Sequence, residues 1–130
     1  MRMRTGSALP IFTTCLAIMA IVVLPVDAQV REGTASWYSV ESCRREGTSG
    51  IMANGRPFND QALTAASWDY PFGTRLLVRH ATRAVVVTVM DRGPNKRLYA
   101  AGRILDLSPK AFEALALLSE GVIHVTIEAL

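Results

Sequence analysis

The sequence predicts a mainly β protein in which six short strands close, or nearly close, into a barrel that carries one short helix. Six runs rich in Val, Ile, Leu, Thr and aromatic residues alternate with segments that contain Gly and Pro. Only the stretch after Ser108 has the spacing of an amphipathic helix. The chain contains no repeat and no low-complexity tract. Composition alone does not choose between the types of small barrel.

The first 28 residues are expected to be a signal peptide and not part of the fold. Arg2 and Arg4 precede a nearly uninterrupted apolar run over residues 11–25, and Val26-Asp27-Ala28 offers small residues for cleavage. The run is short for a bilayer span, although an uncleaved membrane anchor is the alternative. We therefore expect a secreted or periplasmic protein with one folded domain, residues 29–130.

The charge of that domain is weak. The whole chain has 14 Lys and Arg against 11 Asp and Glu, and removal of Arg2, Arg4 and Asp27 leaves a net charge of about +2. This charge is too small and too dispersed to predict nucleic-acid binding. It suits a loose attraction to an anionic wall polymer or membrane surface.

The two cysteines do not predict an internal disulfide. Cys15 lies inside the apolar run and away from the cleavage point, so it is misplaced for lipid modification. Cys43 is then the single cysteine of the domain. We expect a half-buried thiol near a loop, because no His stands in a recognisable partner motif for a nucleophile.

The six strands are expected in regular succession. Thr, Trp and Tyr mark the first strand and Val-rich runs mark the later ones. A tight connection is expected at Ala81-Thr82, and in the last strand Ile123 and Val125 should point to one side. Segments 39–55 and 91–102 are expected to be loops. The predicted strands span residues 33–38, 63–66, 74–79, 83–90, 103–107 and 122–129.

One helix is expected between the last two strands. Ser108 is a suitable N-cap and Pro109 suits the first helical position. Phe112, Leu115 and Leu118 recur at three-residue spacing and form an apolar face. Gly121 is expected to end the helix.

Four motifs in a fixed order carry a resemblance to a known family. They are Gly33-Thr34-Ala35-Ser36-Trp37-Tyr38, Asn54-Gly55-Arg56-Pro57-Phe58-Asn59, the pair Ala62-Leu63-Thr64-Ala65-Ala66 and Tyr70-Pro71-Phe72-Gly73-Thr74, and the pair Val89-Met90-Asp91-Arg92-Gly93-Pro94 and Arg103-Ile104-Leu105-Asp106-Leu107-Ser108. From residue 33 to residue 130 the chain resembles the rare lipoprotein A family of septal-ring lytic transglycosylases.

The resemblance implies a six-stranded double-psi β-barrel, a fold shared with expansins and some endoglucanases. It also implies a groove for a peptidoglycan glycan strand. Family members cleave the MurNAc–GlcNAc bond within the strand without water and leave a 1,6-anhydro end, and they favour glycan stripped of its peptides. We expect no cofactor.

Asp91 is the candidate catalytic residue. It follows an apolar strand and opens a loop with Gly93 and Pro94, which predicts a carboxyl at a barrel rim beside a cleft. One carboxyl can protonate the departing oxygen and then deprotonate the sugar's own 6-hydroxyl. Apolar neighbours such as Val89 and Met90 are expected to raise its pKa. The alternative is that Asp91 accepts backbone N–H bonds and caps the loop.

The sequence departs from the family at the other polar positions of the site. Arg56 stands where active members have Glu, Asn59 where Asp is frequent, and Ser67 where His is usual. Asp60 and Asp69 lie close to these positions and are possible substitutes. Activity is therefore expected to be reduced.

Several residues in the matching motifs are candidates for substrate binding. Hydroxyl and amide groups of Tyr38, Thr64 and Asn59 can bond to sugar, and the ring of Trp68 can stack on it. Arg56 is either a carboxylate-binding group or a solvated charge. Arg92 either contacts substrate or forms a structural ion pair with Asp106, which is the interpretation we favour.

No His, Cys and Asp spacing resembles a metal site, and no phosphate loop or Gly-x-Ser-x-Gly motif is present. Two functions remain open. The first is a lytic transglycosylase that acts on peptidoglycan through Asp91. The second is a non-catalytic, expansin-like module that binds wall glycan, and a purely structural envelope protein is a third, weaker reading.

Overall fold

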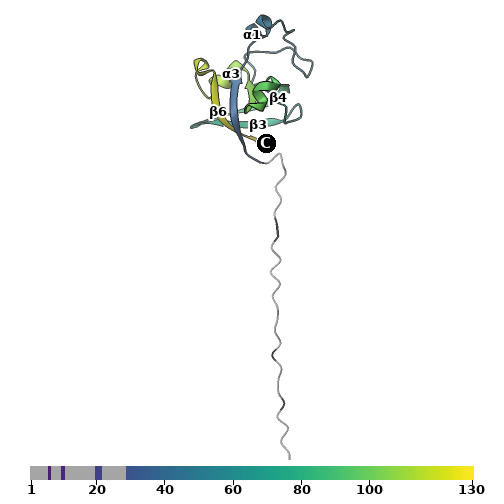
Figure 1. Ribbon diagram of the computed structural model, residues 1–130, viewed down its shortest axis with the longest axis vertical. Coiled ribbons are helices and arrows are strands. Elements are labelled where there is room, and N and C mark those ends of the chain that lie inside the picture. Colours follow the sequence, from purple (N-terminus) through teal and green to yellow (C-terminus); the bar gives the residue numbers. More distant parts are fainter. Residues whose placement is uncertain (1–5, 7–9, 11–19, 22–28) are drawn as a thin grey trace, which may run out of the picture.

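The six predicted strands form one closed β-barrel in a computed structural model of the protein (Figure 1). The structure describes residues 29–130 together with residues 6, 10, 20 and 21, so the predicted signal peptide lies almost entirely outside the described residues. The strands are β1 (Arg31–Trp37), β2 (Thr64–Ala66), β3 (Arg75–His80), β4 (Arg83–Asp91), β5 (Arg103–Leu107) and β6 (Val122–Ala129).

The barrel is mixed, and its strand order is β1-β5-β2-β4-β3-β6. β1 pairs with β5 and β2 pairs with β4 in parallel, whereas the other four pairs are antiparallel. Both parallel ladders contain a register shift, between Thr34 and Ala35 in β1 and between Ala65 and Ala66 in β2. This topology confirms the predicted double-psi β-barrel. The β3–β4 connection at Ala81-Thr82 is also as predicted.

The prediction of a single helix is wrong. The segment after Ser108 forms only α3 (Pro109–Glu113) and, after a turn, the 3-10 helix η2 (Leu118–Glu120). Helix α3 is capped at Ala114, and Leu115, in the turn that follows, packs into the core. Two further short helices, α1 (Val40–Arg45) and α2 (Lys96–Ala100), lie in segments expected to be loops.

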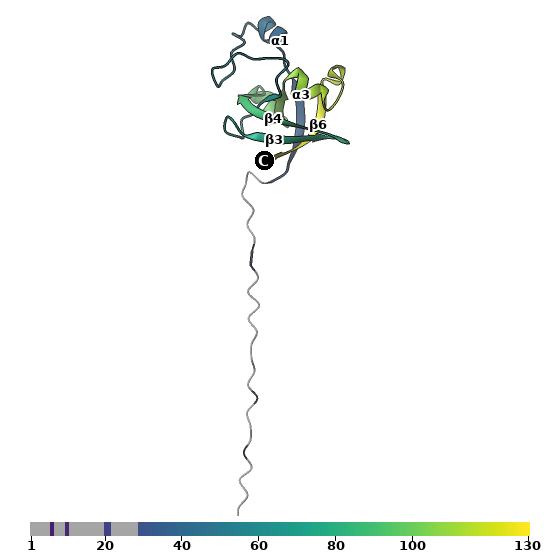
Figure 2. The same cartoon turned by 180° about the vertical axis from the view of Figure 1, so that it is seen from behind.

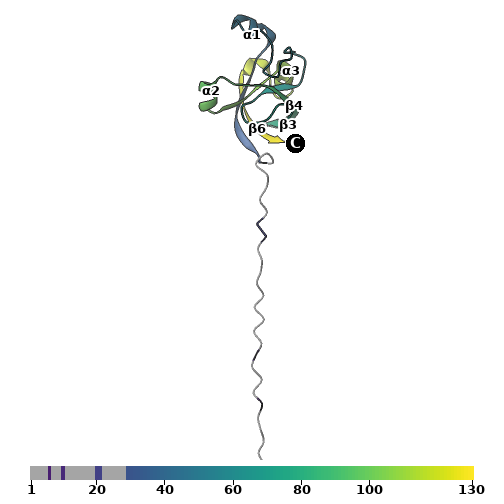
Figure 3. The ribbon, with the colours of Figure 1, turned by 90° about the vertical axis from the view of Figure 1, so that its right-hand side faces the viewer.

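Side-chain caps start both of these extra helices. The Ser39 hydroxyl accepts the Ser42 N–H at 3.1 Å, and the Ser39 N–H donates to the Ser42 hydroxyl at 2.8 Å. The Asn95 side chain accepts the Arg97 N–H at 2.9 Å. α1 lies beyond one end of the barrel, opposite the C-terminus (Figure 2), and α2 lies on its flank, apart from α3 (Figure 3).

The core fills the barrel interior and is closed by α3. Phe112 from α3 is fully buried, and it shares the cluster with inward side chains of all six strands. Ile123, Val125 and Ile127 of β6 alternate with more exposed neighbours, as the sequence predicted. The polar residues that follow the strands are therefore carried on a rigid support.

Gly33→Ala is expected to lower the free energy of unfolding by about 1–3 kcal/mol because the added methyl group overpacks the β1–β5 ladder. A Cβ on Gly33 would lie 2.8 Å from Ile104 Cγ1 and 2.9 Å from the Gly102 carbonyl oxygen. Urea denaturation measures the change. Glu32→Ala, on an exposed position of the same strand, should change stability by less than about 0.5 kcal/mol. Equal effects of the two variants would contradict the packing argument.

Candidate functional site

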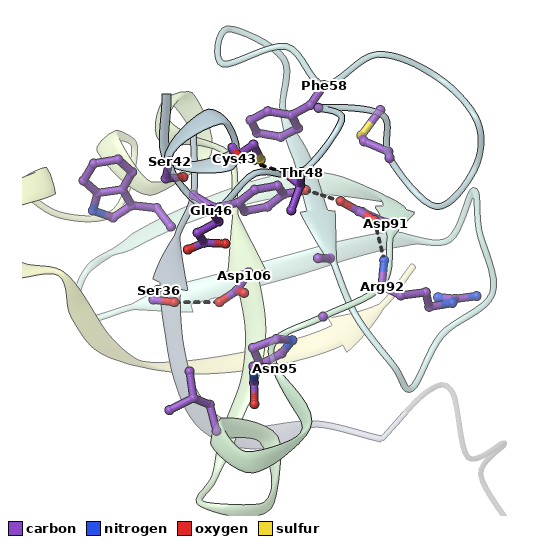
Figure 4. Close-up of a pocket in the computed structure, with 18 of the residues that line it drawn as sticks. Ser36, Ser42, Cys43, Glu46, Thr48, Phe58, Asp91, Arg92, Asn95 and Asp106 are labelled. Atoms are coloured by element: carbon purple, nitrogen blue, oxygen red, sulfur yellow. Dashed lines mark hydrogen bonds between the residues drawn. The ribbon is translucent and has the colours of Figure 1, made fainter. Parts of the chain in front are cut away.

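A cleft of about 490 Å³ opens at the end of the barrel that carries α1 (Figure 4). One wall comes from β1 and the segment after it, through Ser36, Trp37 and Tyr38. A second wall comes from α1 and the loop that follows it. The rest of the lining comes from the segment after β4 and from β5. The volume falls within the range of pockets that hold small ligands.

Asp91 lies on this cleft, at the end of β4, where the sequence placed it. Its carboxylate accepts three hydrogen bonds. Oδ1 accepts the N–H groups of Ala53 and Arg92 at 2.9 and 2.8 Å, and Oδ2 accepts the Tyr38 hydroxyl at 2.9 Å. Three donors thus hold the carboxylate, and Val89, one of the two apolar neighbours named in the sequence analysis, is fully buried in the core. Asp91 also holds the loop through backbone N–H groups, as the alternative interpretation proposed.

Tyr38 is tied to Asp91 and to the cleft wall. Its ring stacks on Phe58 with centroids 4.3 Å apart. Burial, followed by the negative charge of Asp91, raises the pKa of the Tyr38 phenol well above its usual value. Tyr38 therefore stays protonated and acts as a hydrogen-bond donor to Asp91.

Asp106 is a second carboxyl in the same cleft. Its Oδ1 accepts the Ser36 hydroxyl at 2.6 Å across the β1–β5 ladder. Burial is the main cause that raises its pKa above the ordinary value, and the negative charges of Glu46 and Asp91 act in the same direction. The Ser36 hydrogen bond and the charge of Arg103 oppose this rise. Sequence reasoning treated Asp106 only as a structural partner and missed its place in the cleft.

The predicted pair between Arg92 and Asp106 does not form. The Arg92 guanidinium donates instead to the carbonyl oxygens of Ser67 and Tyr70, each at 2.8 Å, and its Cζ lies 3.9 Å from the centroid of the Phe72 ring. Figure 4 shows this side chain pointing away from Asp106. Arg92 is a lining residue of the cleft, but its guanidinium binds carbonyl oxygens of the segment between β2 and β3 and not a carboxylate.

Arg103 brings positive charge into the cleft from the start of β5. Its Nε is buried and has no hydrogen-bond partner within residues 29–130. Sequence reasoning assigned it no role beyond a strand position.

The remaining predicted binding residues do not line the cleft. Thr64 is buried in β2, and its hydroxyl has no partner within the described part of the chain. Arg56 and Asn59 are exposed on the loop before β2, where Asn59 Oδ1 accepts the Gln61 N–H at 2.9 Å. Trp68 is 38% exposed, but its indole N–H donates to the Pro94 carbonyl at 2.6 Å and Lys96 Nζ lies 4.0 Å from its ring centroid.

Neither aspartate suggested as a substitute reaches the cleft. Asp60 accepts the Val40 N–H at 2.8 Å and so fixes the start of α1. Asp69 pairs with Arg31 at 3.3 Å and accepts the Tyr99 hydroxyl at 2.6 Å. Ser67 is fully buried. The carboxyls that line the cleft within the described residues are Asp91, Asp106 and Glu46.

Glu46 and Cys43 reach the cleft from α1 and the residue after it. Cys43 is a free, half-buried thiol, as the sequence predicted. No sequence signal distinguished Glu46 from the neighbouring charged residues. Among the described residues, no group of three or more His, Cys, Asp or Glu is arranged to hold a metal ion. The same part of the chain has no helix long and apolar enough to cross a membrane.

Comparison with known proteins agrees with the barrel fold. The chain is 36% identical, over 98% of its length, to a Synechocystis protein described as "Probable endolytic peptidoglycan transglycosylase RlpA". It spans less than half the length of the curated relatives it matches, and 39% of this one.

Solved structures share the fold. The Streptomyces papain inhibitor superposes with a TM-score of 0.60 at 25% identity, covering 78% of this chain and 94% of the inhibitor. An expansin of Clavibacter michiganensis superposes with a TM-score of 0.56 at 24% identity, covering 78% of this chain and 50% of the expansin. The family model described as "Lytic transglycolase" matches residues 30–127, nearly the whole barrel, and the chain therefore belongs to the lytic transglycolase family.

Proposed function

We propose that the cleft cleaves MurNAc–GlcNAc bonds within peptidoglycan glycan strands and leaves 1,6-anhydro ends. The observation that supports this most is the presence of two carboxyl groups with contrasting surroundings on one cleft. Asp91 accepts three hydrogen bonds, whereas Asp106 accepts one from Ser36 and has a pKa that burial raises. Of two carboxyls on one cleft, the one that burial favours in its protonated form can act as the acid and the other as the base.

The reaction needs no water and no net proton. Asp106 donates its proton to the glycosidic oxygen as the bond from that oxygen to C1 breaks, and positive charge develops at C1. The 6-hydroxyl of the same sugar attacks C1, and Asp91 accepts the proton that this hydroxyl loses. Exchange with solvent then returns each carboxyl to its starting form. This scheme divides between two groups the tasks that the sequence analysis gave to Asp91 alone.

The rest of the cleft binds and orients the strand in this proposal. Tyr38 keeps Asp91 in place through its hydroxyl, and Arg103 brings positive charge to the wall of the cleft. A protein with this substrate acts outside the cytoplasm, so the proposal includes export by the signal peptide, residues 1–28. It requires no cofactor and no nucleic acid.

A second candidate is a module that binds glycan without cleaving it. One observation favours this alternative. The positions that hold Glu and His in active family members hold Arg56 and Ser67 here, and neither lines the cleft. If the Glu and His groups are essential for the reaction, the cleft binds a sugar chain but does not cleave it.

Incubation of the protein with purified glycan strands, with and without stem peptides, distinguishes the candidates. Anhydro-ended products detected by mass spectrometry support the enzyme if they disappear with the Asp91→Asn variant. Cosedimentation with peptidoglycan without such products supports the binding module. Absence of both products and cosedimentation would overturn both proposals.

A further inference from the structure

The proton donor assigned above, Asp106, is surrounded by charged and titratable groups from several elements. Ser36 from β1 donates to it, Arg103 lies earlier on its own strand, and Asp91 lies after β4. Glu46, at the C-terminal end of α1, lines the same cleft and is its one lining carboxylate among the described residues that does not come from a barrel strand. The other titratable groups on the cleft are Tyr38, Cys43 and Arg92.

Glu46 is held in place by the end of α1. Its backbone N–H donates to the Ser42 carbonyl at 3.0 Å and caps the helix. Figure 4 shows its side chain pointing into the cleft, toward Asp106. The position of this carboxylate therefore depends on the placement of α1 over the cleft.

The charge of Glu46 is not neutralised by its neighbours. The two basic residues of α1, Arg44 and Arg45, both pair with Glu41, at 3.4 and 3.2 Å. Glu46 forms no ion pair within residues 29–130. Glu46 is exposed, so its negative charge acts on Asp106 from the solvent side of the cleft, where water and salt screen it in part.

A carboxylate facing a second carboxyl opposes ionisation of that carboxyl, because two like charges repel. The pKa of Asp106 is raised first by burial, and the charge of Glu46 adds to this effect. The positive charge of Arg103 lowers the pKa of Asp106 and so opposes the effect of Glu46.

We propose that Glu46 is a positioning residue for the proton of the site: its carboxylate, carried to the mouth of the cleft at the end of α1, faces Asp106 and opposes loss of the proton that Asp106 donates. This inference rests on the function proposed above. Helix α1, which lies outside the barrel, thereby influences proton donation by Asp106, a residue of the barrel. Glu46 acts through Asp106 and does not need to contact substrate.

Glu46→Gln tests the inference by two independent measurements. The first is the titration of the Asp106 carboxyl by NMR, in protein without substrate. We expect Asp106 to ionise at lower pH in Glu46→Gln than in the unmodified protein. The second is the pH dependence of kcat/KM on glycan strands. Its alkaline limb, where Asp106 loses its proton, should move to lower pH, with a severalfold loss of activity on that limb.

Glu32→Gln is the matched control, because it makes the same change at an exposed residue of β1 that does not line the cleft. It should leave both measurements unchanged. Glu46→Asp keeps the negative charge, so its Asp106 titration should lie closer to that of the unmodified protein than the titration in Glu46→Gln does. A loss of packing alone would not explain this return. Arg103→Gln should move the Asp106 titration in the opposite direction, to higher pH.

The outcomes separate the inference from the proposed function. An unchanged Asp106 titration in Glu46→Gln overturns the inference even if anhydro products form. A shifted titration in a protein that forms no product supports the electrostatic role of Glu46 and overturns the proposed reaction. Equal shifts in Glu32→Gln and Glu46→Gln would also overturn the inference, because the effect would then follow the net charge of the protein.

Discussion

Asp91→Asn is expected to lower kcat/KM on glycan strands by about a hundredfold to ten-thousandfold, the usual contribution of a positioned acid or base. The amide keeps the shape of the carboxylate but cannot accept the proton of the 6-hydroxyl. It also carries no negative charge to stabilise the positive charge that develops at C1. Release of anhydro-ended fragments, followed by mass spectrometry, measures the loss.

The fold should tolerate this change, so the loss reports on chemistry. The amide oxygen can still accept the N–H groups of Ala53 and Arg92, and the Tyr38 hydroxyl can turn to accept from the amide nitrogen. A change to Ala would remove all three bonds and release the loop around Ala53, which makes it a poorer test.

Asp60→Asn is the matched control for Asp91→Asn. Asp60 is also a carboxylate that accepts a backbone N–H, from Val40, but it lies off the cleft. An amide oxygen can keep that bond, so activity should stay close to that of the unmodified protein. Activity of Asp91→Asn within about threefold of the unmodified protein would exclude Asp91 as the base.

The strand positions could be predicted because the pattern that marks a strand lies within its own few residues. The strands 103–107 and 122–129 agree with β5 and β6 to the residue, and the first four differ by two residues or fewer at either end. β-Branched and apolar runs bounded by turns are sufficient for this. The helices were not readable in the same way. α1 and α2 bury no residue, so they leave no apolar periodicity to detect.

The helix after Ser108 shows the opposite error. Its apolar residues continue past Glu113 at helical spacing, and the sequence therefore predicted a helix as far as Gly121. Leu115 is indeed buried, but it reaches the core from a turn, and the indole of Trp37 donates to the Leu118 carbonyl at 3.0 Å. Tertiary packing decided the conformation of a segment whose pattern also fits a helix.

Only the part of the site that depends on the end of a single strand could be predicted from the sequence. Asp91 could be placed from the loop that follows β4. Asp106 could not be placed against Ser36, because the two are 70 residues apart and meet through a parallel pairing that closes the barrel. The direction of the Arg92 side chain depends on carbonyl groups of the turn at Ser67 and Tyr70, so the pair predicted with Asp106 was wrong.

Phe112→Ala is expected to be the most damaging substitution for stability, with a loss of about 3–5 kcal/mol in the free energy of unfolding. Phe112 is fully buried and belongs to the core cluster, and α3 packs against β1, β4 and β5. The missing ring leaves a cavity that these strands can fill only by moving. A small domain has about 5–15 kcal/mol in total, so the variant loses a large share of it.

Urea denaturation should show a lower midpoint with an unchanged slope for Phe112→Ala. Lys110→Ala, an exposed change on the same helix, should alter stability by less than about 0.5 kcal/mol. Because β1, β4 and β5 also carry Ser36, Asp91 and Asp106, activity at moderate temperature should fall in proportion to the folded fraction. A loss of kcat/KM in the fully folded variant would mean that α3 sets the geometry of the carboxyls directly, through the strands on which it packs.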